Sequence, residues 1–264
     1  MLTRLMALTL MAGVMIGTPA QAQIFHSLKE AILGKQTADG RSSHTPAVAH
    51  FVSDRGEGFI LDQSSQAAPL LRFDGDDEVF QLSATPGAKG DIIFKNDVGE
   101  PVLKATRLGG MIVFSSANGD AGDPAALTGA ASAFSPDRVT LTELLLHMYR
   151  SSTRISTLCE HQVEFSADSQ TDKKGGDSSL PVFAETVSVA ADALVQIAVQ
   201  ADTKRALNRL HEVYFMEGRP PSAHIEKGVL IIKVDPDKGA WGGHPSSKRI
   251  MNVVMAGADK EMKR

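Results

Sequence analysis

The chain has 264 residues, with 27 lysines and arginines against 31 aspartates and glutamates, so its formal net charge at pH 7 is −4. That length suffices for one large domain or two small ones, and the negative balance gives no general attraction to nucleic acid or anionic lipid. The one cysteine, Cys159, excludes an internal disulfide, and we expect it to be a buried apolar thiol.

The first 22 residues are typical of a secretory signal peptide. Arg4 precedes the apolar run from Leu5 to Ile16, and Ala20-Gln21-Ala22 fits the small-x-small cleavage pattern. The run is shorter than the roughly 18 residues that cross a bilayer. We therefore expect cleavage after Ala22, a periplasmic or secreted protein, a flexible lead-in over residues 23–48, and no transmembrane segment in the mature chain.

Residues 49–116 predict a β-rich module. Short apolar bursts recur roughly every ten residues, with turn residues such as Asp74-Gly75-Asp76 between them, which is typical of an antiparallel meander, a sandwich-like sheet or a small barrel. Within this module, we predict a three-strand meander over residues 91–95, 102–107 and 111–115, because the intervening Asn, Asp and Gly residues suit tight turns.

Residues 117–136 are rich in Gly, Ala, Ser, Asp and Pro, and we interpret them as a linker to an α+β module over residues 137–264. Thr140 and Glu143 form a capping-box pattern at the start of a helix. That helix carries one apolar stripe, made of Leu141, Leu144, Leu145 and Met148. The sequence "HQVEFSA" (161–167) is consistent with a strand, and residues 168–179 with an exposed polar loop.

Residues 181–216 predict a long helical region in two helices, the second carrying Leu207, Leu210 and Tyr214 and stopped at 218–221. Residues 228–234 predict a buried strand. A Gly-rich loop then leads to a final helix capped by Ser246 or Ser247. The fold class is thus predicted to be α+β.

Chemical motifs are incomplete, and we predict no cofactor and no metal. Gly56-Glu57-Gly58 lacks the third glycine of a dinucleotide loop, and His211 lacks the histidine four residues later that a zinc-protease helix needs. For the acidic run from Asp74 to Glu78 we weighed a calcium site and favour a solvated turn. For Cys159 and His161 we weighed a thiolate–imidazole pair and favour a buried thiol.

The best binding candidates are Trp241 and His244, in the stretch "KGAWGGHPSS" (238–247). Trp241 could stack on a ring or sugar, and the free amides of the following helix N-terminus could hold an anion. The alternative, which we favour, is that Trp241 plugs the edge of the core while the glycines make a turn.

Two blocks carry a family resemblance: "GDIIFKNDVGEPVLKATRLGGMIVF" (90–114), and the C-terminal strand, loop and "HPSSKRI" helix. With the export signal, they resemble a bacterial family of exported proteins that contain a domain of unknown function. The resemblance covers most of the mature chain. It implies no substrate, cofactor or catalytic residue.

The leading functional hypothesis is a non-enzymatic envelope protein that binds or assembles with another envelope protein or a small ligand. One alternative is an extracytoplasmic hydrolase with dispersed residues drawn from His161, His211, His224 and His244, because triads scattered in sequence are not visible as motifs. The other is a carrier that holds a small apolar ligand inside the β module.

Overall fold

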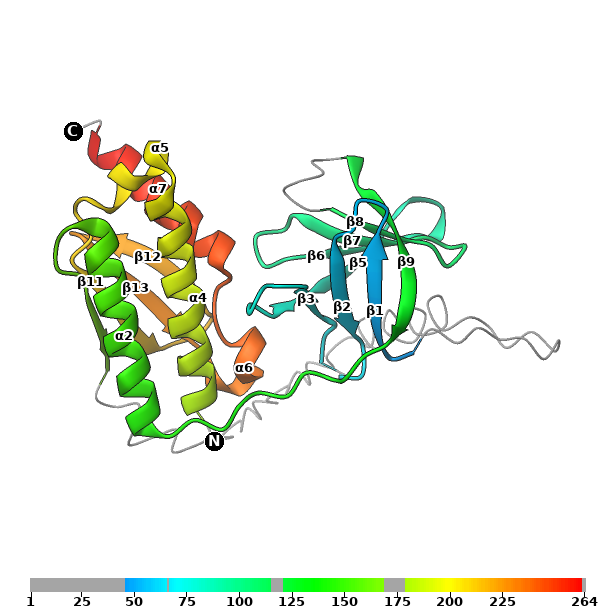
Figure 1. Cartoon of the computed structure of the whole chain (residues 1–264), viewed down its shortest axis with the longest axis horizontal. Coiled ribbons are helices and arrows are strands. Elements are labelled where there is room, and N and C mark those ends of the chain that lie inside the picture. The colour runs from blue at the N-terminus through cyan, green and yellow to red at the C-terminus, as the bar shows by residue number, and fades with distance from the viewer. Residues whose placement is uncertain (1–45, 66, 115–120, 169–178, 263–264) are drawn as a thin grey trace, which may run out of the picture.

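The computed structural model describes residues 46–65, 67–114, 121–168 and 179–262. The predicted signal peptide, most of the lead-in and most of the polar loop at 168–179 lie outside the described residues. The predicted α+β class is confirmed: a β module is followed by a module of helices and strands, and the segment after the last barrel strand runs between them (Figure 1).

The β module is a nearly closed antiparallel barrel of nine strands in the order β4-β3-β2-β1-β9-β8-β7-β6-β5. Only Leu82 separates β4 from β5 in the chain, although they end the two sides of this order, so the sheet must curl round on itself. Phe59, Phe94 and Leu103 are fully buried inside. The strands are β1 (Val48–Ser53), β2 (Gly58–Asp62), β3 (Leu70–Phe73), β4 (Phe80–Gln81), β5 (Ser83–Pro86), β6 (Ile92–Lys95), β7 (Pro101–Ala105), β8 (Met111–Val113) and β9 (Asp123–Ala130).

The predicted meander is confirmed as β6, β7 and β8, which pair in succession with Leu103 opposite both Phe94 and Val113. The predicted linker at 117–136 is wrong in part, because β9 lies inside it and pairs with both β8 and β1. Most side chains of β9 face solvent, so its sequence lacks the apolar alternation by which strands are recognised.

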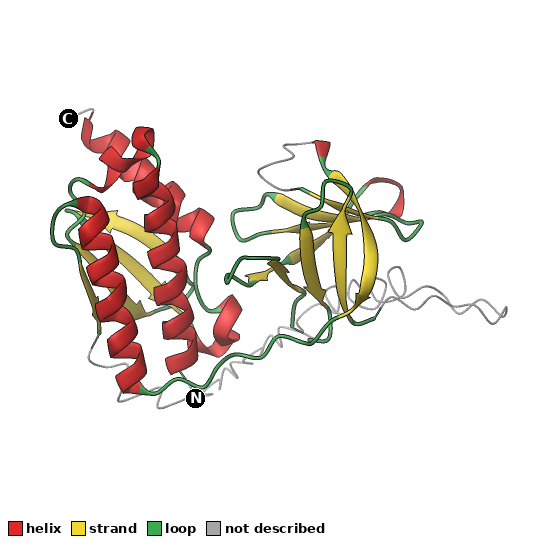
Figure 2. Ribbon diagram, viewed as in Figure 1, coloured by secondary structure: helices red, strands yellow, loops and turns green. Residues whose placement is uncertain are grey.

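The second module is a four-stranded sheet in the order β10-β11-β13-β12, with helices packed on it. Strands β10, β11 and β13 run parallel and β12 is antiparallel to β13. Figure 2 shows α2 and α4 lying across this sheet. The elements are α2 (Leu141–Cys159), β10 (Glu164–Ala167), α4 (Leu180–Val199), α5 (Ala201–Lys204), η4 (Arg205–Leu207), β11 (Glu212–Glu217), β12 (Ser222–Glu226), β13 (Val229–Val234), η5 (Pro236–Lys238), α6 (Gly239–Gly242) and α7 (Ser247–Met262).

The predicted helical region at 181–216 is correct for α4 but wrong at its end, because residues 212–217 form β11. Tyr214, which we assigned to a helical face, lies in this strand between the buried Val213 and Phe215. Pairing with β10 and β13 on its two sides decides the conformation, and such tertiary pairing overrides local pattern. The strands predicted at 161–167 and 228–234 are confirmed as β10 and β13.

Helix α4 is apolar enough that length and composition alone would let it cross a membrane, with a mean hydropathy of 1.6 over 18 residues. We did not expect such a segment from the sequence. Of that window, 61% is buried inside the module, where α4 packs against α2 and α7. The same apolarity is required of a core helix covered on several sides.

The capping box of α2 is confirmed: the Thr140 hydroxyl accepts a hydrogen bond from the Glu143 amide (3.3 Å), and the Glu143 carboxylate accepts one from the Thr140 amide (2.8 Å). We expect Thr140→Ala to lower the free energy of unfolding by about 1 kcal/mol, because the Glu143 amide loses its acceptor and the Glu143 carboxylate loses the hydrogen bond from the Thr140 hydroxyl. Urea denaturation measures the change. Thr157→Ala, on the exposed side of the same helix, is the control and should leave stability unchanged or slightly raised; equal losses in both variants would contradict the capping role.

Candidate functional site

The N-terminus of α7 begins at the junction of the two modules. Ser246 precedes the helix, and its hydroxyl accepts a hydrogen bond from the Arg249 amide at 3.2 Å, which confirms the predicted cap. Strand β13 and the short turns η5 and α6 deliver Ser246 to this place, within hydrogen-bond distance of the β module.

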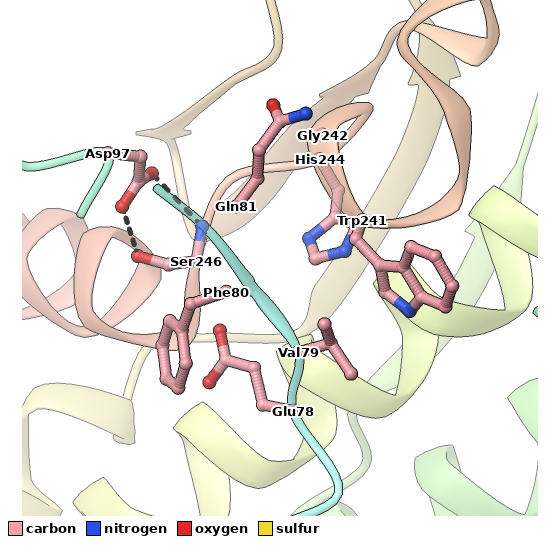
Figure 3. A pocket seen from close by; sticks show the side chains of 9 residues that line it. All are labelled: Glu78, Val79, Phe80, Gln81, Asp97, Trp241, Gly242, His244 and Ser246. Carbon is pink, nitrogen blue, oxygen red and sulfur yellow. Dashed lines mark hydrogen bonds between the residues drawn. The ribbon is translucent and has the colours of Figure 1, made fainter. Parts of the chain in front are cut away.

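Two carboxylates of the β module bind this helix end. Asp97, in the turn between β6 and β7, accepts hydrogen bonds from the Ser246 amide (3.1 Å) and from Arg249 Nε (2.7 Å), and the Arg249 guanidinium also donates to the Asp97 carbonyl. Glu78 accepts a hydrogen bond from the Ser247 amide at 2.9 Å. Figure 3 shows the Asp97 carboxylate turned toward Ser246.

These contacts answer the prediction of an anion site at this helix end. The N-terminus of a helix favours negative charge and hydrogen-bond acceptors. Here Asp97 supplies a carboxylate, and a carboxyl oxygen of Glu78 supplies a second acceptor. The amides of Ser246 and Ser247 are therefore already engaged. The two amides of the anion site that we weighed against a structural role are thus not free, and their hydrogen bonds join the two modules.

Trp241 packs against the connection between the modules. Its ring meets Phe134 edge to face, with centroids 6.1 Å apart, and the Arg72 guanidinium lies 5.1 Å from the centre of the Phe134 ring. The Phe134 amide donates to the buried Asp62 carboxylate at 2.9 Å. This is the packing role that we favoured, and stacking of Trp241 on a ligand stays a prediction.

The close turn that follows Trp241 requires glycine at position 243. A Cβ atom at Gly243 would lie 2.6 Å from the Asp235 carbonyl oxygen and 2.7 Å from that of Gly239, which no side chain tolerates. The Asp235 amide donates to the Gly243 carbonyl at 2.8 Å. The glycines thus permit the close turn that brings His244 and Ser246 to the junction.

His244 is 7% exposed, and its Nδ1 lies 3.0 Å from the Pro245 carbonyl oxygen. A carbonyl only accepts, so Nδ1 carries the hydrogen and Nε2 is left as an acceptor. Burial lowers the pKa of His244, which keeps the ring neutral. Nε2 has no hydrogen-bond partner among the described residues.

His244 and Trp241 both line a cavity of about 60 Å³, together with Glu78, Gln81, Asp97 and Ser246 (Figure 3). The structure therefore brings the two sequence candidates together at one place. The space suits a few water molecules or one small donor group, and it is much smaller than the roughly 300–1,000 Å³ of small-molecule sites.

One further acid, Glu185, lies close enough to Glu78 for their charges to interact. Burial raises the pKa of Glu78 to about 7, helped by the charges of Asp97 and Asp76. Burial also raises the pKa of Glu185, on α4, to about 7, and the nearby charge of Glu78 adds to the effect. The β module and the helical module each contribute one of these two coupled carboxyl groups.

The other residues weighed for chemistry lie in structural contacts. The His161 ring contacts the carbonyls of Cys159 (3.0 Å) and Leu210 (2.6 Å), so it is not directed to the Cys159 thiol, which is buried. Asp74 contacts His50 at 2.8 Å, whereas Glu78 binds α7, so the acidic run does not converge. Within the described ranges, no three His, Cys, Asp or Glu side chains are placed to share a metal ion.

We expect Asp97→Ala to lower the free energy of unfolding by about 2 kcal/mol, because Ser246 and Arg249 lose their shared acceptor while partly buried. Thermal and urea denaturation measure the loss. Asp54→Ala, in an exposed turn of the same module, is the control. A loss no larger than that of the control would contradict the role given to Asp97.

The contribution of Glu78 and Glu185 to stability should fall as the pH rises past neutrality. Both folded-state pKa values lie above that of a free glutamic acid, so folding favours the protonated carboxyls, and the stability present near pH 4.5 is lost as the pH passes about 7. Between about pH 5 and pH 8, we expect the free energy of unfolding to fall by about 2 kcal/mol less in Glu185→Gln than in the wild-type protein.

Denaturation curves across this pH range test the expectation. Glu143→Gln is the control with the opposite pH dependence. Hydrogen bonds from Thr140 lower the pKa of Glu143, so the contribution of Glu143 to stability is present at high pH and is lost as the pH falls. Parallel pH curves for wild type and Glu185→Gln would contradict the account.

Comparison with known proteins identifies a family. A family model described as "Domain of unknown function (DUF4908)" matches residues 27–254, which covers both modules and the junction between them. No curated protein and no solved structure matches the chain. The match confirms the resemblance to an uncharacterised domain family, and the chain belongs to the DUF4908 family.

Proposed function

We propose that this protein is exported, cleaved after Ala22, and acts in the cell envelope as a non-enzymatic binding or assembly protein. The signal-like first 22 residues support the export step. The single observation that carries the binding step is an apolar surface on α2.

This surface, the outer side of α2, consists of Leu141, Leu145, Leu146 and Tyr149, whose side chains are 44%, 56%, 44% and 70% exposed. From the sequence, we placed Leu141 and Leu145 in one apolar stripe with Leu144 and Met148. The stripe in fact divides: Leu144 and Met148 are buried in the core, whereas Leu141, Leu145 and Tyr149 follow one another at four-residue intervals on an exposed side.

Grouped exposed apolar side chains in a soluble module are typical of an interaction surface. Beside them, a shallow groove of about 600 Å³ runs between α2 and α4, lined by Tyr149, Leu158 and Val199 and bordered by the exposed Arg150 and by Arg154. Arg154 has only a half-exposed pairing with Asp192 at 3.3 Å, which contributes little. The chemistry suits an envelope protein that presents an apolar helix with acidic neighbours.

A photo-crosslinking amino acid at Tyr149 tests the binding surface in intact cells. The control places the same amino acid at Leu108, which is 95% exposed in a turn of the β module. We expect one discrete adduct from position 149, lost when Leu145→Glu is added, and no adduct from position 108. Equal adducts at both positions, or none at 149, would overturn the proposed surface.

Export has its own test. The mature protein recovered from a periplasmic or culture-medium fraction should begin at Gln23, and deletion of residues 2–22 should retain the protein in the cytoplasm. A chain that keeps Met1 and stays in the cytoplasmic fraction would contradict the export step alone, without bearing on the surface of α2.

A further inference from the structure

We propose that a pocket at the far end of α7, between η4 and the turn joining β12 to β13, binds a small anionic amphiphile such as a medium-length acyl carboxylate. The pocket belongs to the helical module and does not involve the outer side of α2 or the module junction. The inference therefore stands independently of the proposed function.

The size and lining of the pocket suit a short apolar chain. Its volume is about 410 Å³, within the roughly 300–1,000 Å³ of small-molecule sites. Its lining includes apolar residues from three parts of the module: Ala206 and Leu210 at η4 and the turn after it, Ile225 on β12, and Met255 and Ala258 on α7. An acyl chain that packs against these apolar side chains is removed from water, which is favourable.

Close packing at Gly257 shapes one wall of the pocket. A Cβ atom there would lie 2.3 Å from Ile225 Cγ2, so α7 and β12 approach each other more closely than any other residue would allow. The pocket opens beside this contact, where α7 runs past η4. Regular elements thus form part of its walls, and the turns at residues 208–210 and at Gly228 complete them.

The charge at the mouth selects an anionic head group. Arg205 and Arg209 line the pocket, and Asp202 is the one acid among the described residues that line it, although the chain as a whole is negative. Arg205 is exposed and forms no ion pair with any residue that the structure describes. A guanidinium group matches carboxylate and phosphate oxygens in two-point hydrogen bonds, so a bound anion would meet an available partner there.

The carrier alternative placed an apolar ligand inside the β module. That interior is occupied by fully buried side chains, including Phe59, Leu71 and Phe94, as is usual in small barrels. The pocket near α7 is the better location for such a ligand. Its arginines also favour an anionic head group, which the carrier alternative did not specify.

Titration with decanoate, followed by amide chemical shifts of the mature protein, tests the proposal. We expect the largest chemical-shift changes at Gly228, Met255 and Gly257. Arg205→Glu should raise the dissociation constant for decanoate about tenfold. Because Arg205 is exposed, this variant should fold normally. Lys89→Glu, an exposed charge reversal on the β module, is the matched control and should bind decanoate as wild type does.

Decyltrimethylammonium has the same apolar chain with a cationic head, and Ala258→Phe fills the pocket without changing its charge. We expect the cationic amphiphile to bind more weakly than decanoate, and Ala258→Phe to reduce binding of decanoate. Equal affinity for both amphiphiles, no effect of Arg205→Glu, shifts confined to another surface, or no decanoate binding up to about 1 mM would each overturn the proposal.

Discussion

The structure depends on the way in which the β module closes the N-terminus of α7. A helix begins with amides that have no partner inside the helix, and at α7 two of the residues there, Ser246 and Ser247, donate to Asp97 and Glu78 of the barrel. The two modules are held together because the hydrogen-bond acceptors for the N-terminal amides of α7 lie in the β module. Arg249 strengthens the contact from the helix side, and Lys248 adds a longer approach to Glu100 at 3.7 Å.

This constraint decides what the junction can do. Its strongest anion-binding groups are already engaged, and the remaining cavity beside His244 is small. The contacts at the helix end therefore serve to hold the two modules in register. A separate, more open cleft of about 970 Å³ is also lined by both modules, with Glu78 and Phe114 on one and Asp192 and Met251 on the other. Further groups available to a partner lie on the outer side of α2 and in the pocket beside the far end of α7.

Local pattern was sufficient where a segment carries its own periodicity. The bursts of apolar residues identified most strands of the barrel, and Thr140 with Glu143 identified the start of α2. Pattern failed where pairing with distant residues decides the outcome. Strand β9 is mostly exposed and is held by its neighbours β1 and β8, and β11 is a strand because β10 and β13 lie on its two sides.

The site shows the same division. Trp241, His244 and Ser246 were found because an isolated tryptophan among glycines before a helix is visible in sequence, and all three line the junction cavity. Asp97 was noticed only as a turn residue, and Glu78 only as part of the acidic run that was weighed as a calcium site. Their partners lie 149 and 169 residues away in the chain, and no sequence spacing indicates which acid will reach which helix end.

The most direct test of this account is the rotational correlation time of each module, measured by backbone amide relaxation. In the wild-type protein, the β module and the helical module should share one correlation time, because α7 is bound at its N-terminus by the barrel. In the Asp97→Ala, Glu78→Ala double variant, each module should stay folded and tumble with its own, shorter correlation time. Separate correlation times in the wild type, or a shared one that survives in the double variant, would contradict the claim that these two carboxylates hold the modules together.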